Sequence, residues 1–513
     1  MAIKTFAAID VGSFELTMKV YEMNGKSPLR RIDRISRRLD LGADTFADGK
    51  ISNEKMDELC KTLKEFDKIM KAYRVDAYQA YGTSAIRETE NMTIVLDQIE
   101  QRTGIRVEPL SNSEQRFLGY KSIAARGEEF QKTIEEKTAI LDIGGGSIQI
   151  SLFDNDTLVS TQNILLGVLR IQEYIHRFDV KPSAVEDFIV EMAMAQLGSY
   201  KKLYLKDRTI QTLIVIDDYV SPLAQRLPSF EKGGTVEYSA FYELIRELRE
   251  SGSAKIGTKY GISEDKMSLA SISAVLTDCI AKLMGATKIW ISGATLCDGI
   301  AYDYAESQNL FKGNHDFEQD IIACAKNISK RYMGSRKRSE TLENISGTIF
   351  DSLKKVHGLG KRERLYLQLA AILHDCGRYI SMTNLGENSY NIIMATEMIG
   401  LSHTERVIVA SVARFYHSKF QYDNPAGIGE GLDRAGYLTV AKLTAILRLA
   451  AGLDRSHKQK LIGLKAAWKE KQLILSVDTT ADITLEGGFF EETKEFFVEV
   501  FHIEPILKQR KVY

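Results

Sequence analysis

Two stretches of this chain repeat one pattern, roughly 130 residues apart. Around Asp10 the chain reads AAIDVGSFELTMKV, and around Asp142 it reads AILDIGGGSIQISLF. In each copy an apolar strand ends in an aspartate, a glycine turn with a serine follows, and alternation resumes in a second strand. A repeat of this size predicts two halves with the same topology.

The rest of the chain divides by its periodicity. Strands alternate with helical patterns to about residue 310, which is typical of the α/β class. From about 316 to 460 helical periodicity dominates, and the tail returns to a mixed pattern. We therefore predict four domains: a first half at 1–130, a second half at 131–312, a helical domain at 313–460 and a small α/β domain at 461–513.

Composition excludes some classes of partner. The formal net charge is -1, so no overall field would attract nucleic acid. No stretch approaches the roughly 20 apolar residues that would span a bilayer. The five cysteines are scattered without a CxxC pair, which favours a reducing compartment. We expect a cytoplasmic protein with neither a nucleic-acid nor a membrane partner.

The two turns suggest a phosphate site. An acid at the end of a buried strand is costly unless a charge pairs with it, and carboxylate oxygens suit Mg²⁺. Glycines let backbone N–H groups approach an anion closely. A tight hairpin that merely needs glycine is the alternative, but two copies that each follow an aspartate favour a ligand.

Several motifs together resemble one protein family. AAIDVGS and LDIGGGS resemble the two phosphate loops of the acetate kinase, sugar kinase, Hsp70 and actin superfamily. Segments 83–91 (TSAIRETEN), 164–174 and 291–303 resemble the exopolyphosphatase/guanosine pentaphosphate phosphatase (Ppx/GppA) family. LHDCGRYIS and LTAILRLAAGLDRSH resemble the HD-like domain of its longer members. The fold class that this implies is two duplicated ribonuclease H-like (actin-like) α/β halves, an all-α HD-like domain and a small α/β C-terminal domain.

The resemblance also implies an activity and a site. The activity is Mg²⁺-assisted hydrolysis of a terminal phosphate from polyphosphate or guanosine pentaphosphate by a homodimer, with guanosine tetraphosphate as a further ligand. The implied catalytic residues are Glu114, Asp142 and Gln149, and the implied metal ligands are Asp10 and Asp142. The implied phosphate-binding residues are Gly12, Ser13, Thr83, Ser84, Arg87, Gly144, Gly145, Gly146, Ser147 and Gly293.

Departures from the family pattern concern this same site. Phe14 replaces an amide in the first loop, and Ile148 and Gln149 replace a hydroxyl and a carboxylate after the second. Gln115 occupies the position aligned with the base, and glutamine cannot accept a proton near neutral pH. Glu114 remains as a candidate base, unless it is an ordinary helix-start glutamate with Ser113 as the N-cap.

Two further segments depart from the pattern. Asp217, Asp218 and Tyr219 stand in place of phosphate-binding glycines, and they form either a metal site or a solvated loop. Cys297-Asp298-Gly299 stands in place of Arg-Glu-Gly. The departures motivate a second hypothesis, a catalytically weak relative that binds a guanosine polyphosphate and acts as a regulator. A sugar- or acetate-type kinase is a third hypothesis, against which the whole-chain resemblance weighs.

The helical domain lacks most of a metal site. His374 and Asp375 are present, but 335–350 holds no histidine and Ala451 stands where a later aspartate is expected, with Asp454 nearby. Two ligands seldom hold a transition metal, so we expect a structural pair. The basic residues nearby could serve a long polyanion or form a solvated face: His417, Lys419, Arg455, His457, Lys458 and Lys460.

Overall fold

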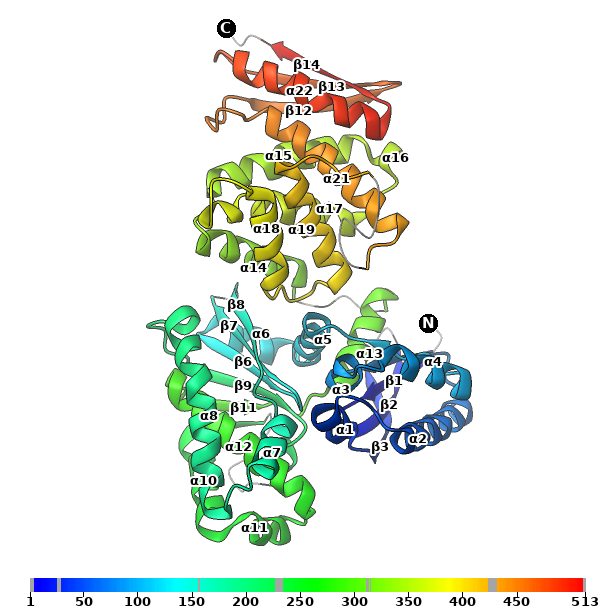
Figure 1. Ribbon diagram of the computed structural model, residues 1–513, viewed down its shortest axis with the longest axis vertical. Coiled ribbons are helices and arrows are strands. Elements are labelled where there is room, and N and C mark those ends of the chain that lie inside the picture. The colour runs from blue at the N-terminus through cyan, green and yellow to red at the C-terminus, as the bar shows by residue number, and fades with distance from the viewer. Residues whose placement is uncertain are drawn as a thin grey trace. The chain divides into compact units, whose positions relative to one another are not determined.

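The structure is a computed structural model that describes residues 4–24, 29–155, 157–226, 234–310, 313, 315–422 and 431–510. The chain forms two compact units, Met1–Phe317 and Glu318–Tyr513, which we call the N-terminal and C-terminal units. Figure 1 shows the elements of each. The four domain bounds predicted above subdivide these units and stay predictions.

The first sheet of the N-terminal unit has the strand order β3-β2-β1-β4-β5. Its β1 pairs antiparallel with β2, which pairs antiparallel with β3, while β1 and β4 run parallel, as do β4 and β5. The strands are β1 (Lys4–Val11), β2 (Glu15–Met23), β3 (Arg30–Arg38), β4 (Ala77–Gly82) and β5 (Glu108–Pro109).

The second sheet repeats this topology. Its order is β10-β11-β9-β6-β7-β8, so that β6, β7, β8, β9 and β11 take the places of β1 to β5. The duplication predicted from the two aspartate-glycine turns is therefore present in the strand order. The strands are β6 (Thr138–Ile143), β7 (Ile148–Asp154), β8 (Thr157–Ile164), β9 (Thr212–Asp217), β10 (Thr235–Glu237) and β11 (Lys288–Ile291).

Amphipathic helices bury the faces of both sheets. Helix α2 (Asn53–Ala72) begins where the Ser52 side chain accepts a hydrogen bond from the Lys55 amide, and one face of it is buried against the first sheet with α4 (Met92–Thr103). Helices α7 (Val168–Arg177), α8 (Val185–Tyr200), α10 (Tyr238–Ser251), α11 (Ser253–Tyr260) and α12 (Glu264–Met284) belong to the second half (Figure 1). The short helices are α1 (Leu41–Asp48), α3 (Ser84–Glu88), α6 (Glu128–Glu135) and α9 (Ser221–Ala224).

One helix ties the second half back to the first. Helix α13 (Leu296–Ser307) follows the last strand of the second sheet, yet its apolar face packs on β1, β2 and α5 (Asn112–Ala124) of the first half. The buried Lys19 forms an ion pair with Asp298 in its first turn, with Nζ 2.7 Å from Oδ2. Helix α13 thus shares an apolar core with β1, β2 and α5 and joins the second half to the first.

Helix α12 is, among the described helices, long and apolar enough to cross a membrane by length and composition. Most of it is buried inside the N-terminal unit, as expected for a core helix. It therefore adds only weak support to any membrane assignment.

The C-terminal unit begins with helices and ends with a small sheet (Figure 1). Its sheet has the order β12-β13-β14, with α22 between the last two strands. This agrees with the predicted helical domain and α/β tail, while the finer HD-like assignment stays a prediction. The elements are α14 (Phe317–Arg331), α15 (Arg336–Ser352), α16 (Lys354–His357), α17 (Lys361–Leu373), α18 (Leu385–Ala395), α19 (His403–His417), α21 (Arg434–Gly452), β12 (Ile462–Lys469), β13 (Gln472–Asp478), α22 (Thr484–Phe501) and β14 (Glu504–Arg510).

The close approach of α13 to α5 can be tested at Gly299. A Cβ there would lie 1.9 Å from the Leu118 carbonyl oxygen, so Gly299→Ala should lower the free energy of unfolding by about 1–3 kcal/mol. Gly198→Ala is the matched control, because no atom lies within 4 Å of its Cβ, and it should stabilise by about 0.5–1 kcal/mol. Denaturant titration measures both. Equal effects of the two substitutions would contradict this packing.

Candidate functional site

The ends of the paired strands line one cavity. It has a volume of about 170 Å³ and lies between the two halves of the N-terminal unit. Asp10 at the end of β1 and Asp142 at the end of β6 both line it. The carboxyl ends of parallel strands in α/β sheets are where ligands bind, and here two such edges meet. Other predicted residues in its wall are Gly12, Ser13, Thr83, Ser84, Gly144 and Gly145.

The first loop is fixed against helix α3. The Ser13 hydroxyl lies 2.9 Å from that of Ser84 and accepts a hydrogen bond of 3.1 Å from the Ala85 amide. At Gly12 a Cβ would come within 2.6 Å of the Glu15 carbonyl oxygen, so the hairpin requires glycine there. The loop is therefore rigid, and its serine is already oriented.

The second loop uses its carbonyl oxygens to bind helix α7, and its amides point to the opposite side. The carbonyl oxygens of Gly144 and Gly145 accept hydrogen bonds from the amides of Val168 and Leu169, in the first turn of α7. In a trans peptide the N–H points opposite to the carbonyl, so the amides of Gly145 and Gly146 point away from α7. Such a pair of N–H groups is suited to a phosphate oxygen.

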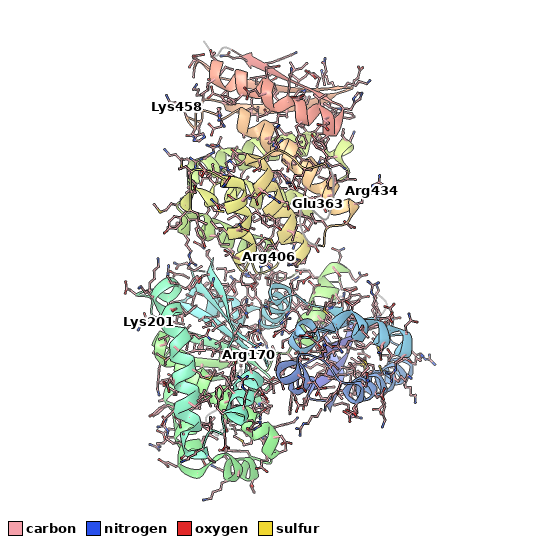
Figure 2. The ribbon with its side chains drawn as sticks, viewed as in Figure 1. Arg170, Lys201, Glu363, Arg406, Arg434 and Lys458 are labelled. Atoms are coloured by element: carbon pink, nitrogen blue, oxygen red, sulfur yellow. The ribbon has the colours of Figure 1, made fainter. Side chains whose placement is uncertain are left out.

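The two loops lie against each other. A Cβ on Gly145 would approach the Ser13 Cβ to 3.2 Å, and one on Gly146 would approach the Ser84 Cβ to 3.3 Å. Arg170 of α7, labelled in Figure 2, holds this contact: its Nε donates to the Gly146 carbonyl oxygen at 3.0 Å and its Nη2 pairs with Glu88 at 2.8 Å. Two loops from distant parts of the chain thus form one binding surface.

A buried arginine, not predicted from the sequence, pairs with the second strand-end acid. Arg116 of α5 forms an ion pair with Asp142 and also donates to the Ser147 carbonyl oxygen and hydroxyl, at 3.2 and 3.1 Å. Only 3% of Arg116 is exposed. Arg116 thus supplies the positive charge that compensates the buried Asp142 carboxylate. A metal ion is not needed for this compensation.

Asp10 has no ion-pair partner of this kind among the described residues. Its Oδ1 is buried without a hydrogen-bond partner among the described residues. Burial, reinforced by the nearby charge of Asp218 and opposed by Lys19, raises the pKa of Asp10 to about 8. A carboxylate in this position is suited to a cation or to a proton-donating ligand group.

Asp217, the last residue of β9, and Asp218, which follows it, have different roles. Asp217 accepts hydrogen bonds from the amides of Tyr219 and Val220 and from the Ser273 hydroxyl, so it shapes the turn, and burial raises its pKa to about 7. Both aspartates line the cavity, and Asp218 adds a second acid near Asp10. The solvated-loop alternative is therefore wrong for Asp217, whose side chain is buried.

Phe14, which replaces a family amide, joins the halves. It lies on the cavity wall and also belongs to the buried apolar cluster that is otherwise formed by the second half. The Arg38 guanidinium lies 5.1 Å from its ring centroid. Arg38 pairs with Asp265, and Glu15 pairs with Lys266 at 2.5 Å, both at the start of α12. The ring thus contributes packing in place of a hydrogen bond.

The structure places some predicted residues away from the cavity wall. Glu114 forms a capping box with Ser111: each side chain accepts a hydrogen bond from the other's backbone amide, so Ser111 and not Ser113 is the N-cap, and Glu114 is not positioned as a base. Gln115 lines the cavity instead, and its Oε1 accepts a hydrogen bond of 3.1 Å from Arg87. Gln115 thereby connects Arg87 to the cavity wall.

Gln149 and Gly293 also lie outside the cavity wall. Gln149 is directly across the β6–β7 ladder from Asp142, but it is buried, and its Nε2 has no hydrogen-bond partner among the described residues. Gly293 lines a separate cavity with Arg126 and Asp298, and from its segment Thr295 and Leu296 reach the cavity between the halves instead. Gly146 lies against Ser84 of the wall, and Ser147 accepts a hydrogen bond from Arg116, the ion-pair partner of the wall residue Asp142.

This fold and this pair of glycine loops define a duplicated α/β protein with a cavity between its two halves. The model of the Ppx/GppA phosphatase family matches residues 20–308, and that of Ppx/GppA phosphatase domain III matches residues 322–494. The chain belongs to the Ppx/GppA phosphatase family.

Individual relatives are distant but extend over most of the chain. A guanosine-5'-triphosphate,3'-diphosphate pyrophosphatase of Aeromonas hydrophila is 21% identical over 494 residues, which is 95% of this chain and 93% of the relative. A protein of the same name from Aeromonas salmonicida is 20% identical over 501 residues, which is 95% of this chain and 93% of the relative.

Solved structures of the family share the fold of about three-fifths of the chain. An exopolyphosphatase from Cytophaga hutchinsonii has 20% identity and a TM-score of 0.52, over 60% of this chain and 100% of its own. The Aquifex aeolicus family member has 16% identity and a TM-score of 0.50, over 60% and 99%. These likenesses confirm the resemblance read from the motifs and the fold.

The Arg116–Asp142 pair can be tested by a double-mutant cycle. Arg116→Met leaves Asp142 without its partner and should cost about 3–5 kcal/mol of unfolding free energy. Arg116→Met combined with Asp142→Asn should recover a large part of that loss, because the uncompensated charge is gone. Denaturant titration of the four proteins measures the coupling, and additive losses would show that the two side chains act independently.

The burial of the Asp10 carboxyl group predicts that the stability of the protein depends on pH. Because its folded pKa is raised to about 8 from 3.8, its contribution to stability is complete below about pH 4 and is lost as pH rises through 8. In EDTA, Asp10→Asn should therefore exceed the wild type in unfolding free energy by roughly 1–3 kcal/mol above pH 8, with the gap closing toward pH 4. A constant gap across this range would contradict the buried, unpaired carboxyl.

Proposed function

We propose that the chain hydrolyses the terminal phosphoanhydride bond of polyphosphate or guanosine pentaphosphate in the cavity between its two halves. The observation that carries this is the contact of the two glycine loops beside Asp10 and Asp142 in one cavity. Membership of the phosphatase family and the names of the relatives support this substrate class.

The residues present fit Mg²⁺ at Asp10. Mg²⁺ keeps several waters and takes one or two carboxylates with substrate phosphate oxygens, so one unpaired carboxylate oxygen in a phosphate site is enough. Among the described residues no group of three or more His, Cys, Asp and Glu side chains could hold a metal ion, so substrate oxygens would complete the shell. The bound ion would neutralise phosphate charge, with Asp10 as its anchor and Asp218 nearby.

The protein itself supplies orientation. The N–H groups of Gly145 and Gly146 hold phosphate oxygens, and Ser13 and Ser84, which lie against this loop, add hydroxyl groups beside them. Asp142, fixed by Arg116, orients the attacking water. Because phosphoryl transfer proceeds through a loose transition state, positioning and charge neutralisation account for most of the rate. The reaction therefore does not require Glu114 or Gln149 as a base.

The alternative is a weak or inactive relative that binds a guanosine polyphosphate and acts as a regulator. The observation that favours it is the presence of amides, Gln115 in the wall and Gln149 beneath it, where family members carry carboxylates. The cytoplasmic location and the homodimer expected from the sequence also stay proposals.

Phosphate release decides between the two. With Mg²⁺ present, the wild type should release phosphate from long-chain polyphosphate or guanosine pentaphosphate, and Asp10→Asn and Asp142→Asn should each lower kcat by about 10²-fold or more. Asp48→Asn, an exposed acid on α1, is the matched control and should leave the rate unchanged. Tight binding measured by calorimetry with no release above background would support the weak or inactive relative instead.

A further inference from the structure

The wall of the cavity between the two halves carries more acids than cations. Among the described residues its cations are Arg34 and Lys266, and Lys266 pairs with Glu15 at 2.5 Å. A polyanionic substrate would be repelled by such a wall unless a positive charge remains available to it. Arg34 is the wall residue that can supply this charge. The acids are Asp10, Glu15, Asp142, Asp217 and Asp218.

Three of these acids already have partners in the protein. Lys266 and Arg116 neutralise Glu15 and Asp142, and Asp217 accepts hydrogen bonds from backbone amides. The other two, Asp10 and Asp218, form no ion pair among the described residues, so they remain for a bound cation. The charge of Arg34 is therefore not needed by the acids of the wall.

The guanidinium group of Arg34 is available to a ligand. Arg34 is exposed, and its side chain forms neither a hydrogen bond nor an ion pair among the described residues. Burial raises the pKa of Asp218, and the nearby charge of Arg34 opposes this rise. Arg34 thus lies close enough to act on groups in the cavity, while its N–H donors have no partner in the described protein.

The register of the first sheet places Arg34 near Asp10 on one face. Asp10 pairs with Thr17 across the β1–β2 ladder, and Lys19, two residues further along β2, pairs with Arg34 across the β2–β3 ladder. Two strand spacings and one two-residue step separate the Cα atoms of Asp10 and Arg34 by roughly 12 Å. One arginine side chain and two linked phosphate groups can span this distance. Thr17, between them, also lines the cavity.

We propose that Arg34 binds the second phosphate group of the substrate and makes the cleft selective for linked phosphates over phosphate monoesters. This inference rests on the proposed function of the cleft. The glycine loops adjoin Asp10 and take the terminal group, whereas the exposed Arg34 meets the group that follows. The guanidinium fork matches two oxygens of a diphosphate. A nucleotide and an inorganic polyphosphate both present such a group, and a monoester does not.

Calorimetry of the full chain with Mg²⁺ and non-hydrolysable ligands tests this role. The wild type should bind methylenediphosphonate more tightly than methylphosphonate, because only the diphosphonate reaches both the glycine loops and Arg34. Arg34→Gln should raise the Kd of methylenediphosphonate about tenfold or more and change that of methylphosphonate little. Arg34→Lys keeps the charge and loses the fork, so its Kd for methylenediphosphonate should be intermediate.

Arg37→Gln is the matched control on the same strand. Arg37 lies three residues beyond Arg34, so its side chain is on the other face of the sheet, where its Nε lies 3.7 Å from Glu65 Oε2. The substitution removes the same charge from an exposed position of β3. It should leave the Kd of both ligands unchanged, which separates direct contact from a general effect of net charge.

The same assay distinguishes two sources of linked phosphate. If a methylene analogue of guanosine diphosphate binds more tightly than methylenediphosphonate, the group beyond Arg34 is a nucleoside. If it binds equally or more weakly, an inorganic chain fits better. Either result supports the role of Arg34 when Arg34→Gln weakens the binding.

Two results would overturn the inference: methylenediphosphonate binding to the wild type no more tightly than methylphosphonate, or binding to Arg34→Gln as tightly as to the wild type. Phosphate release from tripolyphosphate by the wild type reports on the proposed hydrolysis separately. Release together with either of these results leaves the hydrolysis standing and removes the role of Arg34. Binding that depends on Arg34, without release, supports the inference and contradicts the proposed hydrolysis.

Discussion

The buried ion pair between Arg116 and Asp142 is the interaction on which the cleft depends. It brings helix α5 to the end of β6 and, through the hydrogen bonds of Arg116 to Ser147, fixes the second glycine loop. That loop in turn contacts Ser13 and Ser84 of the first half. Arg116, which neutralises one strand-end acid, thus links the first half to the glycine loop of the second. The other acid, Asp10, has an oxygen without a hydrogen-bond partner among the described residues.

Features that depend on neighbouring residues in the chain could be predicted from the sequence. Aspartate-glycine hairpins can be recognised from neighbouring residues, so the duplication and the shared cavity were predictable from Asp10 and Asp142. The S-x-x-E spacing of Ser111 and Glu114 is itself the signal of a capping box, and it indicates a structural role for Glu114 and not that of a base. Arg116 was not predictable as the partner of Asp142, because that contact depends on how α5 packs against β6.

The burial of residues on one face of β7 could not be predicted from the sequence either. Alternation in β7 places Gln149 opposite Ile148 and Ile150, but the sequence does not show which layer covers each face, and Gln149 proved to be buried. In the C-terminal unit, scattered basic residues were compatible with a solvated face or a polyanion site. Only the fold shows that Arg338, Arg448 and Arg455 surround one cavity.

A crystal structure of the full chain grown with Mn²⁺ and methylenediphosphonate tests the shared cleft most directly. Mn²⁺ stands in for Mg²⁺, and its anomalous signal locates the ion. The account predicts the ion at Asp10 and phosphonate oxygens within hydrogen-bond distance of the Gly145 and Gly146 amides. An ion bound elsewhere, or a diphosphonate that contacts only one of the two glycine loops, would contradict it.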